Sequence, residues 1–132
     1  MSKINGLTLK SLLVADALTC TAMGTMLLAG SAAISPITHI PQPLLHYAGL
    51  SLFPIAAFMA LTVMASTPRW AVNLVILGNL LWAVASVLLP AGGFIAPNAL
   101  GWFALIGQAA IVALLAKLER GASGNRLAAS RA

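Results

Sequence analysis

The sequence predicts an all-α fold, a bundle of four membrane-spanning helices. The prediction depends on composition, on four long apolar runs and on the prolines between those runs. Of the 132 residues, 61% are hydrophobic and only 7% are charged, whereas a soluble domain carries about 25% charged residues. Each run is long enough to cross a hydrocarbon core of about 30 Å. Because the runs occupy most of the chain, we expect a single membrane domain and no separate soluble domain.

Proline sets the expected helix boundaries. The first helix should stop at Ser35 and Pro36, because proline lacks a backbone donor and disfavours helix in the residue before it. Pro43 is suited to begin the second helix, and Thr67 is expected to cap the third, with Pro68 in its first turn. The expected helices are therefore 9–34, 44–66, 68–89 and 98–120.

Two further backbone signals lie in the second helix and after the fourth. Pro54 falls near the middle of the second helix, where it frees the carbonyl four residues earlier and predicts a kink. Gly121 should close the fourth helix. Residues 121–132 are small, polar and basic, so we expect a disordered cytoplasmic tail.

Basic residues predict the orientation of the bundle. With four spans, every Lys and Arg falls on one side of the membrane, and the loops 35–43 and 90–98 contain neither. The positive-inside rule therefore predicts two antiparallel hairpins in a bacterial inner membrane, with both termini in the cytoplasm. The basic residues are scattered at helix ends, which favours the lipid bilayer over nucleic acid as the partner.

Asp16 is the one ionisable side chain that we place inside the long apolar runs. A carboxylate costs about 2.5–3.5 kcal/mol at the centre of a membrane helix and normally faces a bundle interior or a water pocket. Counted from the helix ends, Asn79 and Gln108 lie near the middle of the membrane, and Asp16 within about two turns of them. We therefore expect Asn79 or Gln108 to contact Asp16, and no second acid near it.

The candidate polar site has two interpretations. In the first, Asp16 is a protonatable acid in a cavity and the amides of Asn79 and Gln108 contact a substrate, as in proton-coupled carriers. In the second, the carboxyl only joins helices, at about 0.6 kcal/mol per hydrogen bond. Trp82, one turn beyond Asn79, completes the site, where its ring either packs in the core or stacks on a flat ligand.

The sequence contains no catalytic, cofactor or metal motif that we can identify. It has no nucleophile elbow, no phosphate-binding glycine loop and no zinc motif. His39 and His46 have no acidic or thiol companion in the sequence nearby, so we expect ordinary histidines at the membrane interface. We therefore expect no enzyme, no cofactor and no metal.

Four segments together resemble a loosely defined group of small four-helix integral membrane proteins of bacteria with no assigned function. The segments are Ala15-Asp16-Ala17, LLHYAGLSLFPIAAFMA from Leu44, GNLLWAVAS from Gly78 and PNALGWFALIGQAAIVALLA from Pro97. The resemblance implies the topology and supplies no reaction or ligand. The plan is also similar to that of small multidrug carriers, which have an acid in the first of four helices. Here that acid is Asp rather than Glu, and the aromatic surroundings are absent.

These observations favour a non-enzymatic accessory, assembly or structural subunit of the inner membrane. Such a protein would work as a homo-oligomer or within a larger membrane complex. The alternative is an oligomeric, proton-coupled transporter of small apolar or cationic compounds that uses Asp16.

Overall fold

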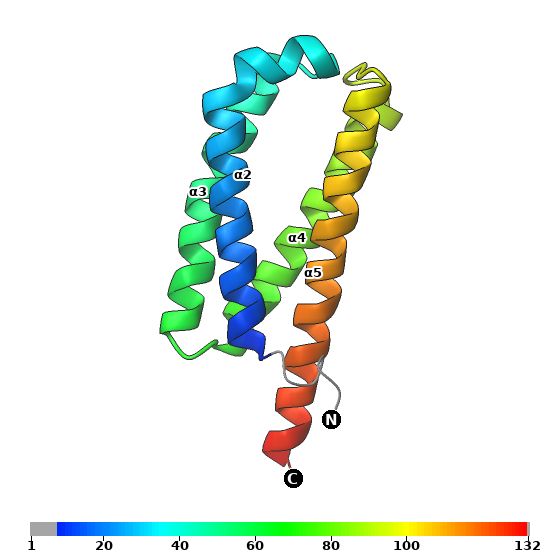
Figure 1. Ribbon diagram of the computed structural model, residues 1–132. Coiled ribbons are helices and arrows are strands. Elements are labelled where there is room, and N and C mark those ends of the chain that lie inside the picture. The colour runs from blue at the N-terminus through cyan, green and yellow to red at the C-terminus, as the bar shows by residue number, and fades with distance from the viewer. Residues whose placement is uncertain (1–7, 132) are drawn as a thin grey trace.

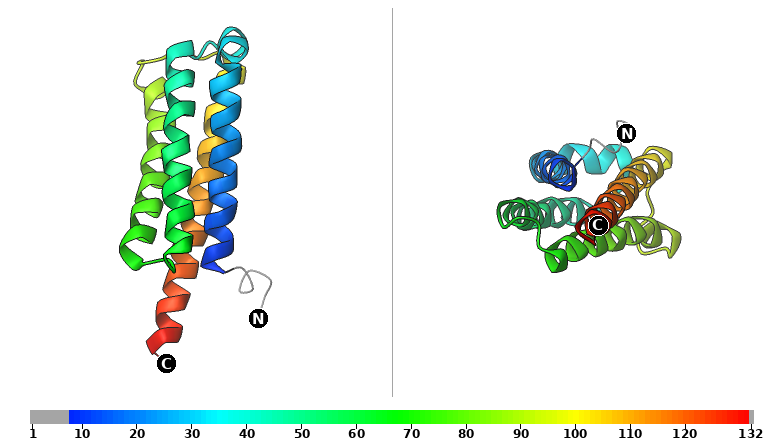
Figure 2. Two further views of the ribbon diagram at one scale, coloured as in Figure 1. Left: turned by 90° about the vertical axis from the view of Figure 1, so that its left-hand side faces the viewer. Right: turned by 90° about the horizontal axis from the view of Figure 1, so that it is seen from below.

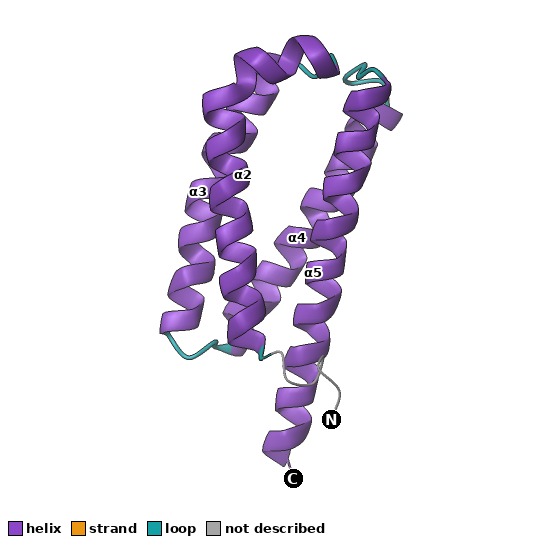
Figure 3. Ribbon diagram, viewed as in Figure 1, coloured by secondary structure: helices purple, strands orange, loops and turns teal. Residues whose placement is uncertain are grey.

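The computed structural model describes residues 8–131, with side chains described as far as residue 124. This part of the chain is all-helical, with four helices and no strand (Figure 3). The helices are α2 (Leu9–Thr38), α3 (Gln42–Met64), α4 (Arg69–Ala91) and α5 (Ala99–Arg131). All four are long and apolar enough to cross a membrane, in α5 over Ala99–Gly124. The all-α, four-helix fold predicted from the sequence is therefore confirmed.

The prediction that α2 stops at Ser35 and Pro36 is wrong, because the helix continues to Thr38. Pro36 removes a single backbone donor, and nearby groups supply other bonds. The Thr38 hydroxyl donates to the Ile34 carbonyl at 2.8 Å. His39 ends the helix in the left-handed conformation, and its N–H donates a hydrogen bond to the Ser35 carbonyl at 2.8 Å. Figure 1 shows the last turns of α2 bending away from the rest of the helix.

Thr67 does not cap α4 as expected. Its backbone is left-handed, with φ of 51°, and its hydroxyl donates to the Ser66 carbonyl at 2.8 Å. Pro68 is the N-cap residue instead, and as a proline it has no side-chain group that could cap the helix. At its other end, α4 continues through Pro90 to Ala91. A proline near the end of a helix therefore costs one bond here without ending the helix.

Asn98 caps α5 and joins it to the end of α2. Its Oδ1 accepts from the Gly101 N–H at 2.9 Å, as an asparagine at the N-cap of a helix does, and residue 98 is where we expected this helix to begin. Its Nδ2 donates to the Ile37 carbonyl at 2.9 Å, and its N–H donates to the Thr38 carbonyl at 3.0 Å. A Cβ at Gly101 would collide with that same Thr38 carbonyl, so glycine permits the close approach.

The prediction of a disordered tail from Gly121 is also wrong, because α5 continues as helix to Arg131. Ala132 lies outside the described residues. Each of the two glycines, Gly121 and Gly124, costs only about 1 kcal/mol in a helix, and the alanines, leucine and arginines around them are good helix formers. In Figure 1 the end of α5 extends beyond the other helices.

The helices pack as two pairs, α2 with α3 and α4 with α5. Gly24 and Gly49 bring α2 and α3 together, since a Cβ at Gly49 would lie 2.8 Å from the Leu28 nitrogen. The two pairs join in a buried apolar cluster at the end of the bundle where α2 begins. Its members include Leu9, Leu13, Met59, Val72 and Ala116.

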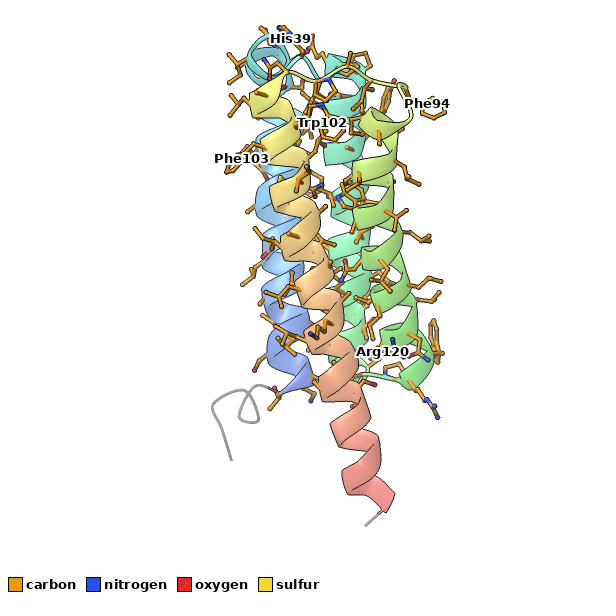
Figure 4. The ribbon with its side chains drawn as sticks, turned by 90° about the vertical axis from the view of Figure 1, so that its right-hand side faces the viewer. His39, Phe94, Trp102, Phe103 and Arg120 are labelled. Atoms are coloured by element: carbon orange, nitrogen blue, oxygen red, sulfur yellow. The ribbon has the colours of Figure 1, made fainter. Side chains whose placement is uncertain are left out.

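Large apolar side chains cover the outside of the bundle. Phe94 and Phe103 are 78% and 77% exposed and point away from the helices (Figure 4). Leu77, Leu81 and Leu88 are exposed along α4. A soluble monomer rarely shows so much contiguous apolar surface, whereas a bilayer would cover it.

Candidate functional site

Two acids meet at one amide inside the bundle. The Nδ2 of Asn79, on α4, donates to Asp16 Oδ2 on α2 at 2.7 Å. The same nitrogen donates to Glu119 Oε1 on α5 at 3.0 Å. An amide nitrogen carries two hydrogens, so each carboxyl receives one. We call Asp16, Asn79 and Glu119 the carboxyl–amide site.

The carboxyl–amide site is shielded from its surroundings. Asp16 is 2% exposed, Asn79 6% and Glu119 0%. Asp16 Oδ1 has a further contact with the thiol of Cys20, one turn along α2, at 3.8 Å. The other oxygen of Glu119, Oε2, is buried with no hydrogen-bond partner among the described residues. An orphaned buried acceptor is uncommon and calls for an explanation, such as a proton.

Glu119 corrects the expectation that Asp16 has no second acid near it. The sequence contains only two acidic residues, and the fold brings both to one amide nitrogen. Glu119 stands between Lys117 and Arg120, where it looks like an interfacial residue. Helix α5 is inclined and continues beyond this point, so its C-terminal half passes near the middle of the bundle (Figure 2).

One signal in the sequence could have found Glu119. One face of α5 carries residues that recur at intervals of three and four positions, namely Gln108, Val112, Leu115 and Glu119. The first three of them line the same cavity as Asp16. Extending this stripe by one more turn reaches Glu119.

Asp16 lines a cavity of about 390 Å³ between all four helices, which we call the acidic cavity. All the residues of the predicted polar site line it, namely Asp16, Asn79, Trp82 and Gln108, and so do Cys20 and Pro54. Most other lining residues are apolar, and none of those in the described part of the chain is Lys, Arg or His. The acidic cavity therefore offers one carboxyl, a few neutral polar groups and a large apolar wall.

The amide contact expected for Asp16 is made by Asn79 and not by Gln108. Gln108 Oε1 instead accepts from the indole Nε1 of Trp82 at 3.0 Å, and its Nε2 donates to the Leu105 carbonyl at 3.1 Å. The indole N–H thereby has the partner that a half-buried tryptophan requires. Trp82 and Gln108 join α4 to α5 within the cavity wall.

Pro54 lies within α3 and contributes to the wall of the acidic cavity. Its lack of a backbone N–H deprives the Leu50 carbonyl of its helical partner. The kink expected at this position stays a prediction.

No arrangement suited to a metal is present in the described residues, where no group of three or more His, Cys, Asp or Glu side chains could hold an ion. His39 and His46 lie elsewhere, at the end of α2 and near the start of α3. The His46 ring packs edge-on against Tyr47, with centroids 5.4 Å apart.

Comparisons with protein-family models, with curated proteins and with solved structures find no match to this chain.

Proposed function

We propose that this protein is a small membrane carrier that exchanges a proton on the carboxyl–amide site for a small lipophilic amine or organic cation. The observation that carries the proposal is the pair of buried carboxyls on one amide nitrogen, with oxygens 2.7 and 3.0 Å from it. Asp16, the carboxyl that lines the acidic cavity, has no Lys, Arg or His beside it among the described residues of the cavity wall. The site therefore requires a positive charge that the cavity wall does not supply.

Charge neutralisation favours a proton in the empty site. Two ionised carboxyls sharing a dry site repel each other, and an uncompensated buried charge costs several kcal/mol. One proton on the pair removes a negative charge and supplies a donor, which the orphaned Glu119 Oε2 lacks. A bound ammonium would neutralise the same charge. Proton and cation are then alternative occupants, which is the basis of exchange.

The acidic cavity indicates the class of ligand. Its volume of about 390 Å³ matches a small organic molecule. Its walls include Met23, Leu52, Phe58 and Val112, which suit an apolar or aromatic body, while Asp16 suits a cationic head. All four helices of one chain contribute to its wall, so the proposed site does not require the oligomer that we expected from the sequence.

We further propose that the four helices form two antiparallel hairpins in a bacterial inner membrane, with both termini in the cytoplasm. Uneven distribution of Lys and Arg supports this orientation. Gln42 and Ala65 are exposed at opposite ends of α3. In a Cys20→Ala background, Gln42→Cys should react with an impermeant maleimide added to intact cells, and Ala65→Cys only after lysis. The reverse pattern would overturn the orientation.

Proton release tests the proposed exchange. Purified protein in a weakly buffered detergent solution is titrated with N,N-dimethylbenzylamine, supplied as its hydrochloride, while a pH-sensitive dye reports released protons. Wild type should release about one proton per bound amine, because a bound ammonium takes the place of the proton on the carboxyl pair. Asp16→Asn should release none, because Asp16 is the one carboxyl among the described residues that line the acidic cavity, and an ammonium there would have no carboxylate to pair with.

Two controls make the titration specific. Protein-free micelles correct for amine that enters detergent. Asn73→Leu, an exposed change on α4, should release protons as wild type does. Binding without Asp16-dependent release would rule out exchange at this site. It would favour the second candidate, a non-enzymatic accessory subunit in which Asp16 only joins helices; that candidate is supported by the three-helix contact of Asp16, Asn79 and Glu119.

A further inference from the structure

A second cavity of about 470 Å³ lies next to the acidic cavity, toward the end of the bundle where Asn98 joins α5 to α2. All four helices contribute to its wall, together with Ile40 and Ile95 from the loops. We call it the neutral cavity, because none of its lining residues in the described part of the chain is Asp, Glu, Lys, Arg or His.

The two cavities share three residues, Met23, Trp82 and Gln108. These side chains therefore form the partition between them. Trp82 and Gln108 are held together by the 3.0 Å hydrogen bond from the indole Nε1 to Oε1. Ser86, which lines the neutral cavity, donates its hydroxyl to the Trp82 carbonyl at 2.7 Å. Met23 is unbranched and adapts to the shape of its neighbours.

We infer that the neutral cavity is a binding compartment for the uncharged form of a lipophilic amine, and that it leads through the Trp82–Gln108 partition to the carboxyl–amide site. This inference rests on the proposed function. It names the form of the ligand and the residues that control its entry.

The lining of the neutral cavity decides the form of the ligand. A cation that entered the neutral cavity from water would find no carboxylate to pair with, and an unpaired buried charge is strongly disfavoured. The neutral amine has an apolar body that suits Leu27, Leu44 and Leu105, and it carries no charge that needs a counter-ion. The neutral cavity therefore excludes the charged form and accepts the free base.

Proton transfer follows only beyond the partition. The carboxyl O–H of the carboxyl–amide site breaks, and its proton forms an N–H bond with the nitrogen lone pair. An ammonium is left beside a carboxylate, and nothing is oxidised or reduced. The proton released to solution is the one that the ammonium gave up in water before it entered as free base. One proton per amine is therefore released overall.

Entry rates test the inference. Proton release after rapid mixing with N,N-dimethylbenzylamine gives a rate and an amplitude for each variant. Trp82→Phe replaces the indole with a smaller aromatic ring that has no N–H, so the partition should open more readily and the rate should rise about fivefold, as for the loss of one ordinary hydrogen bond. Trp102→Phe is the matched control, because Trp102 lines neither cavity, and it should leave the rate unchanged.

A second pair of variants fills the neutral cavity. Ala85 lines this cavity and Ala83 lines neither one. Ala85→Leu should slow proton release roughly five- to thirtyfold at unchanged amplitude, because the larger side chain obstructs the compartment. Ala83→Leu should have the wild-type rate.

The amplitude of proton release tests the proposed exchange, and the rate of proton release tests the route through the neutral cavity. Absence of any Asp16-dependent amplitude in wild type would refute the exchange itself. A normal amplitude whose rate is the same in Ala85→Leu, Ala83→Leu and wild type would overturn the route through the neutral cavity and leave the exchange intact. A rate that falls in Trp82→Phe, or stays unchanged there, would show that the hydrogen-bonded pair is no partition.

Discussion

Replacing Asn79 with leucine should destabilise the protein by about 3 kcal/mol. The substitution removes both hydrogen bonds of the carboxyl–amide site and leaves Asp16 and Glu119 as buried acceptors without their donor. Leaving these buried acceptors unpaired lowers the free energy of unfolding by more than the two hydrogen bonds contribute to it, because water cannot replace the lost amide inside the bundle. Equilibrium unfolding in mixed detergent micelles measures the difference in free energy of unfolding.

Asn73 supplies the matched control for this prediction. It lies on the same helix and is exposed, so Asn73→Leu should change the free energy of unfolding by no more than about 0.5 kcal/mol. Adding Glu119→Leu to Asn79→Leu should restore part of the loss, since one stranded carboxyl is then gone. If Asn79→Leu and Asn73→Leu have the same free energy of unfolding, Asn79 does not stabilise the two acids.

Much of the fold could be predicted from the sequence because it follows from local composition. The four apolar runs give the number of helices, and Asn98 gives the start of α5 through a bond within its own first turn. The ends of α2 and α4 could not be predicted in this way. Pro36 and Pro90 are local stop signals, but each lies in a last turn where neighbouring groups supply other bonds.

The candidate site was predictable only in part, for a different reason. Similar depth in the membrane brings Asp16 and Asn79 together, and depth can be counted along a helix. Contact between residues at the same depth also depends on the rotation and inclination of each helix. Counting residues along a helix does not give these two quantities. Gln108 consequently pairs with Trp82, and Glu119, which was not among the predicted site residues, reaches Asn79.

Infrared spectroscopy offers a direct count of the protons on the carboxyl pair. Asp16 and Glu119 are the only acidic side chains in the sequence, so the C=O band of a protonated carboxyl has no other side-chain source. The band shifts on exchange into D₂O, which distinguishes it from lipid and detergent esters. The C-terminal carboxyl is ionised at neutral pH.

Wild type without ligand should show one protonated carboxyl per chain at neutral pH. Saturating N,N-dimethylbenzylamine should abolish the band, because the proton then resides on the bound ammonium. The double variant Asp16→Asn with Glu119→Gln should lack the band throughout. Two ionised carboxyls in ligand-free wild type, or a protonated carboxyl that persists at saturating amine, would contradict the exchange of a proton for an ammonium at Asp16, Asn79 and Glu119.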